Sequence, residues 1–116
     1  MGAGFAYDAP TVELDILGEA VTLRIGDVDT VRSVDDACRT IASLGEDASW
    51  GELSERLRGF IRTVMGDEAF ERAFGGRPAN VIEEIECLAY IRRRIRESLA
   101  DGDALASAVR RLMEVG

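Results

Sequence analysis

The segment TVELDILGEAVTLRI, residues 11–25, constrains the fold more than any other part of the chain, because its apolar residues recur at every second position. The apolar members are Val12, Leu14, Ile16, Val21, Leu23 and Ile25. A period of two on both sides of a glycine-containing turn predicts a β-hairpin over residues 11–26 with one apolar face. An isolated hairpin is marginally stable in water, so a helix or another chain must cover that face. Val12 and Leu14 are therefore candidate contacts with a partner, and the hairpin edge is a candidate for strand addition.

Helical periodicity dominates the chain from residue 31 to residue 116. The predicted helix starts are marked by capping residues: Ser33 with Asp36, Ser49 with Glu52, Asp67, and Asn80 with Glu83. Gly45 is expected to end the first helix, and Trp50 to begin the apolar stripe of the second. In the longest helix, residues 87–91 (CLAYI) are apolar all round, so both sides of that helix are expected to pack against other elements.

At 116 residues the chain is long enough for one domain with one core. The predicted class is α+β, mainly α: a loose leader over residues 1–10, the hairpin, and then a bundle of four or five helices. No apolar run reaches the ~18–20 residues that a membrane helix requires, so we expect no membrane partner. The first residues lack the basic and apolar regions of a signal peptide, which favours a cytoplasmic protein.

The residues that usually carry chemistry are scarce. Histidine and lysine are both absent, which removes the commonest general base and the phosphate-binding lysine of nucleotide-binding loops. Glu83, Glu84 and Glu86 could hold a hard cation, but acidic residues are also favoured at a solvated helix start, and we expect the latter here. Cys38 and Cys87 are expected to be small core residues. The sequence therefore predicts neither an enzyme, a metal site nor a cofactor site.

The one basic cluster is RRRIR, residues 92–96, in a chain of net charge −8. Arg92 and Arg96 share a helix face, whereas Arg93 can reach Glu97. An acidic protein repels phosphate backbones, so we do not expect nucleic-acid binding. Two other interpretations stay open: these arginines pair with the acidic N-terminal half, or they contact an acidic partner or a neighbouring copy of the chain.

Two aromatic residues stand on a short predicted helix between two longer ones. Phe70 and Phe74 are four residues apart, on a segment too short to be a stable helix alone. They therefore either attach this helix to the core or present an aromatic anchor to a partner.

Residues 60–91 (FIRTVMGDEAFERAFGGRPANVIEEIECLAYI) resemble the second half of the tail assembly chaperones of long-tailed bacteriophages and prophages. In that family a helix ends in an acidic, glycine-containing turn, and a short helix follows whose last aromatic residue precedes a glycine and a polar cap. The matching residues are Gly66, Phe70, Phe74, Gly75, Gly76 and Asn80. Many relatives have a second glycine in the turn, which is absent from the MGDEA of this chain.

The resemblance implies a non-enzymatic protein that forms homo-oligomers and binds the tape measure protein until tail tube protein displaces it. Such a protein would act in the cytoplasm of the bacterial host. The alternative is another phage structural protein, such as a head–tail connector subunit, or a bacterial protein-binding adaptor.

Overall fold

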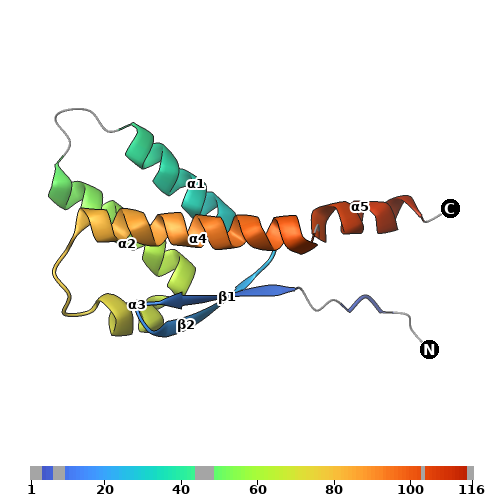
Figure 1. Ribbon diagram of the computed structural model, residues 1–116, viewed down its shortest axis with the longest axis horizontal. Coiled ribbons are helices and arrows are strands. Elements are labelled where there is room, and N and C mark those ends of the chain that lie inside the picture. The colour runs from blue at the N-terminus through green and yellow to red at the C-terminus, as the bar shows by residue number, and fades with distance from the viewer. Residues whose placement is uncertain (1–3, 7–9, 44–48, 103, 115–116) are drawn as a thin grey trace.

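The computed structural model describes residues 4–6, 10–43, 49–102 and 104–114. Within them an antiparallel hairpin precedes five helices (Figure 1). The elements are β1 (Thr11–Ile16), β2 (Glu19–Arg24), α1 (Val28–Ala42), α2 (Trp50–Met65), α3 (Asp67–Phe74), α4 (Val81–Gly102) and α5 (Ala104–Met113). The predicted class and element order are confirmed. Of the leader, the described residues 4–6 and 10 have no regular secondary structure, and the others lie outside the described residues.

The hairpin buries the face that the alternation predicts. Its register pairs Ile16 with Glu19 and Thr11 with Arg24, and Leu17 and Gly18 form a two-residue turn. The buried side chains are Val12, Leu14, Ile16, Val21 and Leu23. Helix α4 packs against β1, and α3 packs against β2. Helices of the same chain therefore supply the cover that the hairpin needs.

Helix α4 lies at the centre of the molecule, with α1 above it, the hairpin below it and α2 crossing behind it (Figure 1). Leu57 and Ile61 of α2 and Leu88 and Ile91 of α4 are almost completely buried where these helices meet. The expectation that α4 packs on both sides is confirmed, although Ala89 in the middle of CLAYI is exposed. Helix α5 extends from the far end of α4, so the molecule is 58 Å long and only 30 Å by 24 Å across.

Two of the predicted helix starts are confirmed. Asn80 Oδ1 accepts a hydrogen bond from the Glu83 N–H (3.0 Å), and Ser49 Oγ accepts one from the Glu52 N–H (3.4 Å). The side chain of Trp50, however, is 70% exposed and does not belong to the core. It precedes Leu53, the first buried residue of α2, by almost one turn, and therefore lies beyond the part of the helix that is covered.

Two other predicted starts are wrong. Helix α1 begins at Val28, because Asp27 accepts hydrogen bonds from the backbone and hydroxyl of Thr30, and Ser33 therefore lies inside the helix. Asp67 is the first residue of α3 and does not cap it; the N-cap position is occupied by Gly66. An acidic residue in the first turn still interacts favourably with the helix dipole. The predicted end at Gly45 lies outside the described residues.

Two glycines shape the path around α3. Gly66 ends α2 and precedes α3 with φ of 88°, a conformation that side chains other than glycine adopt only with strain. At Gly75 a Cβ atom would lie 2.3 Å from the carbonyl oxygen of Glu71, so the chain can turn away from α3 there only because no side chain is present. Together they allow the chain to turn sharply both before and after the short helix α3.

Candidate functional site

The short helix α3 places its two phenylalanines in the core. Phe70 is 4% exposed and Phe74 is 1% exposed, and their rings stack with centroids 5.0 Å apart. Helices of eight residues are not stable alone, so this burial explains why α3 forms at all. Of the two interpretations left open by the sequence, attachment to the core agrees with the structure. Neither ring is accessible as an anchor for a partner in this conformation.

Two arginines of α2 lie over these rings. The guanidinium of Arg62 is 4.7 Å from the centroid of Phe70, and that of Arg58 is 5.7 Å from the centroid of Phe74. Arg62 also forms an exposed ion pair with Glu71 (2.7 Å). Such contacts between a cation and an aromatic face are attractive, so α2 and α3 are held together by more than apolar contact.

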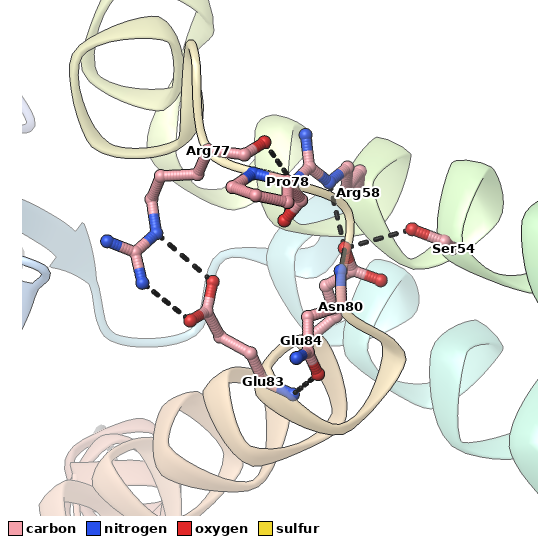
Figure 2. A network of polar contacts seen from close by, with 7 residues as sticks. All are labelled: Ser54, Arg58, Arg77, Pro78, Asn80, Glu83 and Glu84. Carbon is pink, nitrogen blue, oxygen red and sulfur yellow. Dashed lines mark hydrogen bonds and ion pairs between the residues drawn. The ribbon is translucent and has the colours of Figure 1, made fainter.

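A polar network joins α2 to the start of α4 (Figure 2). The carboxylate of Glu84 is completely buried and forms an ion pair with Arg58 Nε (2.8 Å). Its Oε2 atom also accepts hydrogen bonds from Ser54 Oγ (2.9 Å) and from the backbone N–H of Asn80 (3.3 Å). The second oxygen, Oε1, is buried and has no hydrogen-bond partner among the described residues. A buried carboxylate of this kind depends on its cation, because an unpaired charge in the core is costly.

The same arginine holds the loop between α3 and α4. Arg58 Nη2 donates to the carbonyl oxygens of Arg77 (3.3 Å) and Pro78 (3.2 Å). Arg77 in turn forms an ion pair with Glu83 (2.6 Å), as Figure 2 shows. The hydrogen bond and the charge of Arg77 lower the pKa of Glu83 below its usual value. Arg58 thus joins α2 both to the loop and to α4.

Sequence reasoning missed this network and placed Glu84 wrongly. Acidic residues at a helix start are usually solvated, but Glu84 faces the core because it shares a helix face with Leu88 and Ile91. That spacing of four and seven residues was the available signal. Its buried position can be tolerated only because Arg58 of another helix reaches it.

The two edges of the hairpin differ. The pairs flanking a two-residue turn exchange hydrogen bonds, so the backbone groups of Glu13 and Asp15 in β1, and of Ala20 and Thr22 in β2, point outward. On β1 the Asp15 N–H donates to the Tyr90 hydroxyl (3.1 Å), and Arg94 donates to the Glu13 carbonyl (3.1 Å). Among the described residues, the outward groups of Ala20 and Thr22 have no such partner. The open edge is therefore that of β2.

A hollow of about 250 Å³ opens beside the hairpin turn. Its lining includes Asp15, Ile16, Leu17, Phe74, Glu83 and Glu86. Cys87 also lines it, and burial, followed by the charges of Glu83 and Glu84, raises the pKa of this thiol to about 11. Cys87 is therefore a protonated, unreactive thiol at neutral pH. Both cysteines are unpaired and packed against the core, in agreement with the sequence.

The remaining predicted interaction residues lie apart from this hollow. Val12 and Leu14 are buried under α4, so they are not available to another chain. Arg92 and Arg96 are exposed on α4, and neither forms an ion pair with another described residue. Asp8, Glu46 and Asp47 of the acidic N-terminal half lie outside the described residues, so the interpretation that these arginines pair with that half stays a prediction. Arg94 reaches the hairpin. Arg93 contacts Glu97 (3.7 Å), as the sequence predicts.

The described residues contain neither a cluster of metal ligands nor a membrane-spanning helix. No three His, Cys, Asp or Glu side chains among them come close enough together to hold a metal ion, although three carboxylates line the hollow. Within the same part of the chain, no helix is long and apolar enough to cross a membrane. Comparison of the chain with known protein families, with curated proteins and with solved structures finds no match.

Proposed function

We propose that this protein is a tail assembly chaperone of a long-tailed bacteriophage or prophage. In this role it works in the cytoplasm of the bacterial host, associates with copies of itself and binds the tape measure and tail tube proteins without catalysing a reaction. The observation that carries the proposal is the path from Gly66 to Asn80. The residues on which the family resemblance rests form a helix, a short helix and a capped long helix, which is the arrangement that the resemblance implies.

Two further features support a role in binding proteins. The open edge of β2 offers unpaired backbone groups to an extended segment of a partner. Helix α5 carries the exposed apolar residues Val109, Leu112 and Met113, which have no evident role in the core. Exposed apolar side chains grouped on one helix are typical of an interaction surface.

Co-expression with the tape measure and tail tube proteins of the same genetic element tests the proposal. We expect the tape measure protein to co-purify with the chaperone, and the tail tube protein to release it when added. If neither protein co-purifies with the wild-type chain, the proposed function is wrong.

A matched pair of variants locates the contact on the β2 edge. Thr22→Pro removes an outward N–H that the hairpin does not use, whereas Thr22→Val keeps it. Both variants lose the hydrogen bond from the Thr22 hydroxyl to Glu13, so this loss does not distinguish them. Proline also restricts the backbone, so circular dichroism must show that both variants are folded. Capture of the tape measure protein by Thr22→Val but not by Thr22→Pro would identify strand addition. Equal capture by both would place the contact elsewhere on the protein.

A further inference from the structure

The hollow beside the hairpin turn combines an apolar floor with an acidic rim. Ile16 and Phe74 contribute to the floor, and Asp15, Glu83 and Glu86 surround it. Glu83 is paired with Arg77, but Glu86 is exposed and forms no ion pair with a described residue. At about 250 Å³ the hollow is below the range of roughly 300–1,000 Å³ typical of small-molecule sites. It suits one or two apolar side chains that come with a positive charge.

Folding alone does not explain why a leucine occupies position 17, at the rim of the hollow. Its φ of 53° is strained for a leucine, and the side chain is 48% exposed. Asn or Gly is the usual choice at this turn position. An exposed, strained leucine is explained if its side chain contacts a partner bound in the hollow.

Helix α5 has the complementary character. Val109, Leu112 and Met113 lie on one face, and Leu112 and Met113 are 72% and 77% exposed. Arg110 and Arg111 stand next to them and form no ion pair with a described residue. A ten-residue helix is shorter than the ~12–15 residues at which isolated helices become marginally stable. The helix is therefore apolar on one face, positively charged and without extensive packing in its own molecule.

The hairpin turn and the start of α4, which contribute to the lining of the hollow, lie at the opposite end of the molecule from α5 (Figure 1). The distance along α4 from Glu83 to Gly102 is about 28 Å, whereas α5 is about 15 Å long, at 1.5 Å per residue. In this conformation α5 points away from the hairpin turn and from the start of α4 (Figure 1). The hollow of one molecule is therefore open to the α5 of another.

We propose that α5 of one molecule docks into the hollow of a second copy, head to tail. Leu112 and Met113 enter beside Leu17 and Phe74, and Arg110, next to Met113 on the helix surface, faces the acidic rim. Because each copy uses one surface and leaves the other free, the contact generates open chains or closes into rings. One short helix in one hollow buries far less than the ~1,200 Å² of a stable interface, so association should be weak and dependent on concentration. The contact specifies the self-association that is part of the proposed function, but it does not depend on whether the chain binds a tape measure protein.

Sedimentation velocity on the purified full-length protein provides the test. The apparent mass of the wild type should exceed the monomer mass of 12.6 kDa and increase with protein concentration between about 10 µM and about 1 mM. Glu86→Arg alters only the hollow, and Leu112→Glu alters only α5; each alone should remain monomeric. The exposed-site controls Glu55→Arg and Val28→Glu should associate like the wild type.

Mixing the two variants decides whether the contact is head to tail. Glu86→Arg retains an intact α5 and Leu112→Glu an intact hollow, so an equimolar mixture should form a one-to-one dimer and nothing larger. This result also requires both variants to be folded. A wild type that stays monomeric near 1 mM overturns the proposal. So does a mixture that stays monomeric, association that survives Glu86→Arg, or association abolished by Val28→Glu. The outcome is independent of the co-expression experiment, because no other protein is present.

Discussion

Replacement of Arg58 by methionine should destabilise the protein far more than its position near the surface indicates. The variant leaves the carboxylate of Glu84 completely buried without its cation. Removal of one partner of a buried ion pair costs about 3–5 kcal/mol. We expect a value near 3 kcal/mol, because the side chain of Arg58 is 22% exposed and water can partly replace it. Loss of the contact with Phe74 adds about 0.5–1 kcal/mol.

The partner substitution should behave differently. Glu84→Gln keeps the shape of the side chain and an oxygen that can accept from Ser54, and Arg58 can still turn toward water. Its cost should be about 1–2 kcal/mol. In the double variant no buried charge remains, so Arg58→Met with Glu84→Gln should be more stable than Arg58→Met alone. The double-mutant cycle should give a coupling energy of at least about 1 kcal/mol.

Urea unfolding followed by far-UV circular dichroism measures these differences. Arg62→Met is the matched control, since Arg62 lies one turn further along α2, also covers a phenylalanine and also forms an ion pair. Its pair with Glu71 is exposed, so its cost should stay below about 1.5 kcal/mol. Equal losses for Arg58→Met and Arg62→Met would refute the reasoning. A double variant no more stable than Arg58→Met would do the same.

Three further results are expected. Because Arg77 lowers the folded-state pKa of Glu83, their pairing stabilises the protein above the unfolded pKa of about 4.3 and is lost as pH falls through the lower folded value. Urea unfolding at neutral pH and at about pH 3 should therefore show a smaller acid-induced loss for Arg77→Met than for the control Arg92→Met. Cys87, with a pKa of about 11, should react with iodoacetamide at pH 8 at least about tenfold more slowly in the folded protein than in urea, as peptide mass spectrometry would show; equal rates would contradict its burial. Leu17→Asn should raise the free energy of unfolding by about 1 kcal/mol, because asparagine tolerates a positive φ, while weakening self-association; unchanged stability in urea would show that the turn is not strained.

The sequence predicted those elements whose signals are local. The hairpin follows from a period-two pattern, and the start of α4 from Asn80, whose side chain accepts from the N–H three residues later. The start of α1 shows the limit of local signals. Asp27 with Thr30 and Ser33 with Asp36 are both plausible caps, and only packing selects the first. The choice between core and interface for Phe70 was likewise open, because it depends on where α2 and the hairpin lie.

The candidate site was less predictable, because distant residues build it. Asp15 and Leu17 belong to the hairpin, whereas Glu83 and Glu86 lie on α4. No pattern within either segment indicates that they meet. The one local signal was Leu17, which occupies a turn position that favours asparagine or glycine. This residue indicates a binding site only once the neighbouring hollow is known.

The dependence of the hairpin on α4 has a consequence for synthesis on the ribosome. Contacts that complete the hairpin join residues 75 and 81 positions apart: Asp15 with Tyr90, and Glu13 with Arg94. At a synthesis rate of about 5–20 residues per second, the apolar face of the hairpin stays uncovered for roughly 4–16 s before α4 is made. A nascent chain that stops before α4 would therefore expose this face to aggregation. A longer product joined after Gly102 would retain all the hairpin–α4 contacts and could complete the same core.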